Sequence, residues 1–161
     1  MRKLFSILLA AMLIVSIAGY SQAQGIVDTD AGPYYEVTSV YNNSGGTLDV
    51  GDVVIWDIGS STGDDDQYVT TTTSADTFLV AGVVYPADIA ASSSGSIVTK
   101  GAVTVDVATS NNINSAGALL CTGTTAGGAA VCSNGQDDGN AFGFTTATVS
   151  SSTVKAYLFG K

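Results

Sequence analysis

The chain has 161 residues, of which 14 are acidic, 5 are basic and none is histidine, so its formal net charge is −9 at pH 7. This balance argues against nucleic acid as a partner, because binding nucleic acid requires cations that displace its counterions. The missing histidine excludes serine–histidine–aspartate triads, cysteine–histidine pairs and most zinc sites.

Residues 1–23 have the three-part layout of a secretory signal peptide. Arg2 and Lys3 precede an apolar run over residues 4–18, and the small-residue stretch 21–23 follows it. The apolar run is shorter than the roughly 20 residues that a membrane-spanning helix needs, and no stop-transfer segment comes after it. We therefore expect cleavage after residue 23 rather than retention as a permanent membrane anchor, and a secreted protein at the extracellular cell surface.

Removal of 23 of the 161 residues leaves 138, a length that suits one domain. The first part, residues 24–46, is predicted to be an extended segment that ends in the first strand. Residues 47–161 are predicted to form the β domain.

Strand patterns follow one another along this domain. The run Val53-Val54-Ile55-Trp56 is continuously apolar, which is typical of a strand buried on both faces. Val103, Val105 and Val107 alternate with small or polar residues, which places the valines on one face of a strand. Turn clusters of Asn, Ser and Gly separate further candidates at residues 34–42, 67–73, 77–85, 96–99, 118–122, 141–149 and 153–159.

Short strands at this spacing predict an all-β fold, an antiparallel β-sandwich or jelly-roll-like barrel of about 8–10 strands. Little or no helix is expected, at most a single turn at residues 87–91, where Pro86 could occupy the first helical position.

Two cysteines, Cys121 and Cys132, flank a Gly-rich segment. In an exported protein this arrangement predicts one disulfide that closes a local hairpin. A metal site would need further cysteines or a histidine, and an oxidising compartment disfavours free thiols. The even count and short separation favour a bond within the chain over one between subunits.

Two acidic loops are candidates for calcium, which binds six to eight oxygen ligands. One loop contains Asp64, Asp65 and Asp66, and the other contains Asp137 and Asp138. Neither loop matches an EF-hand, because both lack its closing glutamate. The competing interpretation is a pair of solvated polar turns, and no other cofactor is expected.

No residue pattern supports catalysis, and we expect a protein that is not an enzyme. Paired carboxylates could hydrolyse glycosides, but these acids lie mainly in turns, where a carboxyl group is seldom buried enough for a raised pKa. A serine–lysine dyad would need Lys100 or Lys155, and lysines on β proteins are usually solvated edge charges.

Several segments together resemble the small β modules of tailed-phage capsid decoration and head-fibre proteins: residues 51–54, 81–105, 119–128 and 141–143. The resemblance spans about residues 37–158 and implies a β-barrel or sandwich that binds a repetitive lattice or forms trimers, without catalysis. The predicted signal peptide and disulfide depart from that pattern, since phage virion proteins assemble in the cytoplasm. The resemblance therefore bears on architecture more than on a capsid role.

The composition favours contact between copies of the chain, because abundant small residues allow subunits to approach closely. The strand at residues 34–42 precedes a flexible Asn-Ser-Gly-rich stretch, so it could leave its own domain and complete a neighbour's sheet. The alternative is that this strand pairs within its own sheet. The candidate interface residues are Tyr34, Tyr35, Val37, Val40 and Tyr41.

We therefore expect a secreted structural protein that self-assembles into an extracellular filament, sheath, tube or surface layer, with copies of itself as partners. The alternative is a secreted binding module, monomeric or trimeric, for carbohydrate or a surface lattice, with calcium at the acidic loops as its candidate ligand. For that alternative, the tyrosines and Trp56 could stack on a sugar, although packing is their more usual role.

Overall fold

The computed structural model describes residues 34–59, 67–108, 113, 115–132, 140–148 and 152–160. The predicted signal peptide and residues 24–33 lie outside this part. The described residues contain no helix, and none that could cross a membrane. They form one sheet of nine strands: β1 (Tyr35–Asn42), β2 (Val53–Trp56), β3 (Tyr68–Thr70), β4 (Val80–Val84), β5 (Ser94–Asp106), β6 (Leu119–Thr122), β7 (Ala129–Val131), β8 (Gly143–Thr145) and β9 (Thr153–Phe159). The predicted all-β fold is confirmed.

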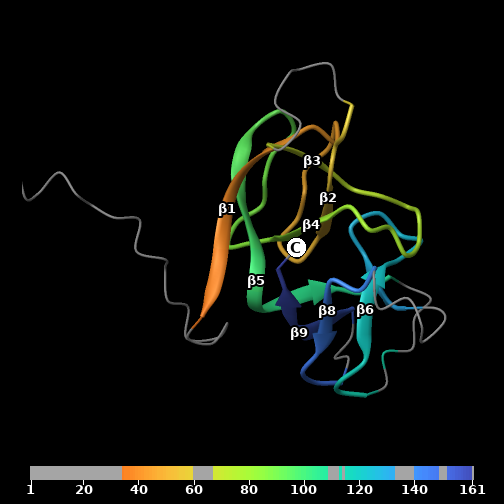
Figure 1. Ribbon diagram of the computed structural model, residues 1–161. Helices are drawn as coiled ribbons and strands as arrows, with labels where there is room; N and C mark the ends of the chain where they lie inside the picture. Colours follow the sequence, from red (N-terminus) through yellow and green to blue (C-terminus); the bar gives the residue numbers. More distant parts are fainter. Residues whose placement is uncertain are drawn as a thin grey trace, which may run out of the picture.

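The first five strands close into a small barrel (Figure 1). Their order is β1-β3-β2-β4-β5, and β1 also pairs with β5, which completes the ring. Neighbouring strands are antiparallel except β1 and β3, which run parallel because the chain passes through β2 between them. Aliphatic side chains fill the barrel: Val40, Leu48, Val54, Val69, Ala81, Val84, Ile89 and Ile97.

A buried polar residue, Asn42, fastens one end of the barrel. Its Nδ2 donates to the backbone carbonyls of Gly46, Ile89 and Ala90 at 2.7, 2.8 and 3.1 Å. Its Oδ1 accepts hydrogen bonds from the N–H and the hydroxyl of Ser44. Because every polar atom of the amide has a partner, its burial carries no unsatisfied group.

Strand β5 belongs to both halves of the molecule. Its first part pairs with β1 and β4, and its second part, from Lys100 onward, pairs with β9. The sequence pattern predicted two separate strands here, at residues 96–99 and 103–107. The structure joins them through Gly101, whose φ of +104° lies in a region that side chains with a Cβ rarely adopt. The glycine is therefore a bend within one strand rather than a break between two.

The second half of the sheet continues from β5 through β9, β8, β6 and β7, and in Figure 1 it lies below the barrel. It curls back on itself, since Val107 and Ala129 form a parallel bridge and the Ala108 N–H donates to the Ala129 carbonyl at 2.9 Å. The 118–122 and 153–159 predictions correspond closely to β6 and β9. Strand β7 was not among the predicted strands, although it lies within the predicted hairpin between Cys121 and Cys132.

The main core lies between the barrel and the second half. Val53, Val83 and Val98 project from barrel strands, and Leu120, Phe142 and Leu158 are among the residues that meet them. Strand β4 is buried at all five positions because one of its faces packs in the barrel and the other in this core. Strand β2, which the sequence predicted to be buried on both faces, is buried at Val53 and Val54 and half-buried at Ile55 and Trp56.

Residues 87–91, where a helical turn was considered, form no helix. Instead, Ile89 pairs with Leu48, each N–H donating to the other carbonyl at 2.8 and 3.0 Å. Ile89 is buried in the barrel, and this tertiary contact outweighs the weak local preference of residues 87–91 for a helical turn.

Candidate assembly surface

The outer side of β9 carries two exposed aromatic rings, next to a half-buried ring of β8. Strand β9 alternates strictly, with Val154, Ala156 and Leu158 buried in the core. The residues between them point outward: Lys155, Tyr157 and Phe159. Tyr157 is 37% exposed and Phe159 is 41% exposed.

These rings form one group with Phe144 of β8. The ring centroid of Phe144 lies 5.7 Å from that of Tyr157, in a stacked arrangement, and 5.8 Å from that of Phe159. We call Phe144, Tyr157 and Phe159 the aromatic face. Ala102 and Leu119 extend its central row, because they lie in register with Tyr157 and Phe144 on the neighbouring strands. A contiguous apolar patch of this kind is typical of a contact surface.

Both basic residues of the described part border the aromatic face. Lys100 lies opposite Phe159 in the strand register, and Lys155 precedes Tyr157 by two residues on the same side of β9. Lys100 forms an ion pair with Glu36 at 3.4 Å, but both side chains are exposed, so this pair contributes little stability.

The predicted β1 interface residues are not brought together on one surface. Tyr34 is 81% exposed and Val37 is exposed, whereas Val40 is buried in the barrel. Tyr35 and Tyr41 are half-buried, and their rings contact Tyr85 and Tyr68 at centroid distances of 6.0 and 5.2 Å. Strand β1 pairs with β3 and β5 of its own chain. This is the arrangement given above as the alternative to strand exchange.

The five aspartates predicted to bind calcium lie outside the described residues, so calcium binding stays a prediction. The structure instead gathers carboxylates from three other segments: Asp49 and Asp52, Asp88, and Asp106. We call these four residues the acidic turn. Within it, the Val50 N–H donates to Asp88 Oδ1 at 2.8 Å and the Asp49 N–H donates to Asp52 Oδ2 at 2.9 Å. No three carboxylates of the described part bring oxygens within 4.8 Å of one another, so the acidic turn is not a preformed cation site.

Burial raises the pKa of Asp52 above its ordinary value of 3.8. The hydrogen bond from the Asp49 N–H lowers this pKa, while the charges of Asp106, Asp49 and Asp88 raise it. Burial also raises the pKa of Asp106, and the charge of Asp49 adds to that shift. At neutral pH the ionised carboxylates of Asp52 and Asp106 therefore lower the stability of the folded state.

We expect Asp52→Asn to raise the melting temperature at pH 7. Because the pKa of Asp52 is raised on folding, its contribution to stability is fully present below pH 3.8 and is lost as the pH rises through the raised value. Asparagine keeps an oxygen for the Asp49 N–H and never ionises. In thermal melts over a pH series, the gap between variant and wild type should be widest at pH 7 and close near pH 3.8. A lower melting temperature for the variant at pH 7 contradicts this account.

The predicted disulfide is confirmed, and it lies within the chain. Cys121 of β6 bonds to Cys132, which follows β7, with the Cα atoms 5.0 Å apart. A carboxylate oxygen of Asp76 lies within 4.8 Å of both sulfurs, but sulfurs in a disulfide are not metal ligands. The bond ties the two strands of the hairpin together.

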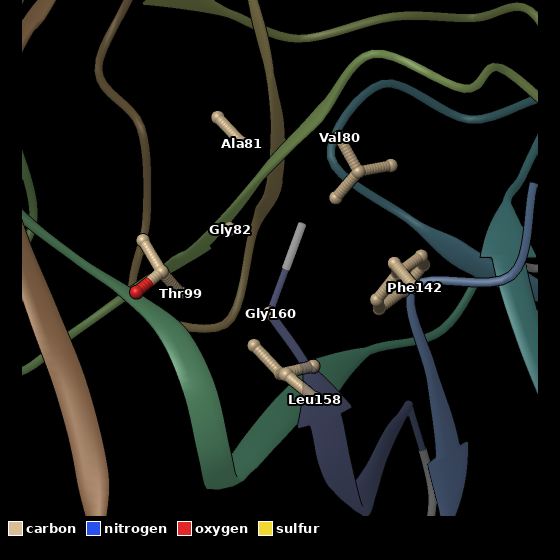
Figure 2. A pocket seen from close by; sticks show the side chains of 7 residues that line it. All are labelled: Val80, Ala81, Gly82, Thr99, Phe142, Leu158 and Gly160. Carbon is tan, nitrogen blue, oxygen red and sulfur yellow. The ribbon is translucent and has the colours of Figure 1, made fainter.

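A small hollow lies where the barrel meets the second half (Figure 2), and seven residues line it: Val80, Ala81, Gly82, Thr99, Phe142, Leu158 and Gly160. Its volume is about 10 Å³, which is room for about one water molecule. Sites for small-molecule ligands are usually of the order of 300–1,000 Å³. This hollow is therefore a packing gap and not a substrate site.

Sequence reasoning missed both the aromatic face and the acidic turn. The signal for the first was present, because the outward positions of 153–159 carry Lys, Tyr and Phe while the inward ones carry Val, Ala and Leu. The acidic turn had no such signal, since Asp52, Asp88 and Asp106 are far apart in the chain.

No family model matches this chain, and no curated protein matches it by sequence. Solved structures share its fold, and two of them are described here. One is titled the head fiber gp8.5 N base in bacteriophage phi29, with 15% identity, a TM-score of 0.52 and coverage of 77% of this chain and 95% of that one. The other is titled the capsid of Myoviridae Phage XM1, with 16% identity, a TM-score of 0.53 and coverage of 77% and 82%. The predicted resemblance to phage capsid and head-fibre modules is confirmed in the fold.

Proposed function

We propose that the chain is a non-catalytic structural protein that is secreted and assembles with copies of itself into an extracellular filament, sheath, tube or surface layer. The observation that carries the proposal is the aromatic face. The ring of Phe144 contacts the rings of Tyr157 and Phe159, and these two are exposed, while the alternate residues of β9 are buried. Aromatic side chains are enriched where proteins contact each other, and a second copy would remove this apolar area from water.

The two structural neighbours support a structural role. Their titles name a phage head fiber base and a phage capsid, which are parts of assembled particles. The predicted signal peptide supports secretion, and for that reason we propose an extracellular assembly rather than a phage capsid.

The size of the native protein tests this proposal. We expect protein purified from outside its producing cells, at neutral pH and without denaturant, to form particles far larger than the 16.2 kDa chain. Light scattering and negative-stain electron microscopy measure this, because regular filaments, tubes or sheets are visible directly. The intact mass of the same preparation should correspond to a chain that begins at residue 24. Uniform monomers at every concentration would contradict self-assembly, and an uncleaved mass would contradict the predicted processing.

A further inference from the structure

We propose that the carboxylate of Asp76 shields the disulfide between Cys121 and Cys132 from reduction by external thiols. The inference goes beyond the proposed self-assembly and does not depend on it. Its first support is proximity, because a carboxylate oxygen of Asp76 lies within 4.8 Å of the sulfur atoms of both cysteines. A negative charge at this distance acts strongly on any anion that approaches the sulfurs.

Hydrogen bonds hold Asp76 in this position. Its N–H donates to the carbonyl of Thr122 at 3.1 Å, and Thr122 directly follows Cys121 in β6. The Thr122 side chain is buried, and its hydroxyl donates to the Ser74 carbonyl at 2.9 Å and accepts from the Thr77 N–H at 2.9 Å. Segment 74–77 is therefore fastened to the residue beside the disulfide at more than one point.

Reduction of the disulfide brings negative charge to this position twice. Cys121 is fully buried and Cys132 is 7% exposed, so Cys132 is the cysteine that an external thiolate can reach. The thiolate bonds to the sulfur of Cys132, the sulfur–sulfur bond breaks, and its electron pair leaves with the sulfur of Cys121, which then takes up a proton. A second thiolate attacks the external sulfur of the mixed disulfide, which releases Cys132 and a disulfide of the two external thiols.

The carboxylate of Asp76 opposes both charges of the first step. It repels the incoming thiolate, and it disfavours the negative charge that develops on the leaving sulfur. Reduction should therefore be slower than burial alone would make it. Because Leu119 packs on the disulfide and pairs with Phe144, the same carboxylate also protects the order of the aromatic face.

Rates of reduction by three thiols test the shield in the mature chain. The thiols are cysteamine, mercaptoethanol and mercaptoethanesulfonate, which carry a positive, no and a negative charge besides the thiolate. Asp76→Asn removes the charge and suits the backbone, because Asp76 has a φ of +56° and asparagine also adopts this region. We expect this variant to be reduced about tenfold faster by mercaptoethanesulfonate, compared per thiolate, and to gain much less with cysteamine.

Glu36→Gln is the matched control. It removes one negative charge from β1, outside segment 74–77 and the hairpin, so it should change each rate by less than about twofold. Mass spectrometry after alkylation counts the reduced chains over time. Circular dichroism melts establish that each variant is folded, and Asp76→Gly serves as a second uncharged variant, since glycine adopts the same φ.

The selectivity among the thiols distinguishes charge from a merely structural role. Equal acceleration by all three thiols would mean that the substitution opens segment 74–77, and this result overturns the proposal. Unchanged rates with mercaptoethanesulfonate in the folded variants overturn it as well. A wild-type protein that stays monomeric contradicts the proposed assembly but leaves these rates, and the shield, untouched.

Discussion

Replacement of Gly101 by alanine is expected to destabilise the protein by about 3 kcal/mol or more. Two effects add at this position. The φ of +104° is strained for any residue with a Cβ. In addition, a Cβ built on Gly101 would collide with the carbonyl oxygen of Tyr34, just before β1, and with the Cα and Cβ of Tyr35, and none of these atoms can rotate away. Because β5 passes from the barrel to β9 at this glycine, the variant should loosen both halves together.

Three other glycines separate the two effects. Gly46 has neither a positive φ nor a neighbour within 4 Å, and its alanine variant should lie within about 0.5 kcal/mol of the wild type. Gly45 has a φ of +78° in open space, and its variant should lose about 1 kcal/mol. Gly82 has an ordinary φ, but its Cβ would meet the Val98 carbonyl, so its variant should lose about 2 kcal/mol. Urea denaturation of the four variants measures these losses. Equal stability of Gly101→Ala and Gly46→Ala would refute the role assigned to the bend.

Loss of the disulfide is the second large expected effect, at about 3 kcal/mol. The bond joins residues separated by 11 positions, and in the chain-entropy treatment a loop of this size restricts the unfolded state by that amount. Cys121 and Cys132 also form a buried cluster with Ala141, against which Leu119 packs. Since Leu119 pairs with Phe144, we expect the aromatic face to lose order when the bond is broken.

Urea denaturation with and without a reductant measures this contribution. Wild-type protein should lose stability on reduction, whereas the Cys121→Ala/Cys132→Ala variant should be insensitive to the reductant. The difference in unfolding free energy between the reduced wild type and the variant gives the contribution of the packing of the two sulfur atoms. If reduction leaves the unfolding midpoint unchanged, the hairpin is held by its hydrogen bonds and packing rather than by the disulfide.

Strands that carry their own pattern were predictable. The alternation of residues 153–159 and the apolar run 53–56 correspond to β9 and β2 as the structure has them. The hairpin closed by Cys121 and Cys132 followed from the spacing of the cysteines, the Gly-rich segment between them and the predicted export. Strand β7 was not recognised, because Ala129-Ala130-Val131 is short and acquires its conformation from pairing with β6. Residues 96–99 and 103–107 were predicted as separate strands, and their union in β5 was not recognised, because a glycine that bends a strand and one that ends it look alike in sequence.

The sequence by itself determined the all-β class and the disulfide, because strand periodicity and cysteine spacing are local patterns, and it determined the resemblance to phage capsid and head-fibre modules through short motifs in chain order. Only the tertiary structure decided that β1 closes a barrel within its own chain, that Val40 is core and that the aromatic face is exposed. It also assembled the acidic turn from Asp49, Asp52, Asp88 and Asp106, whose neighbourhood is a consequence of strand order. Alternation along a strand shows that two faces differ, but which face is covered depends on what the rest of the chain packs against it.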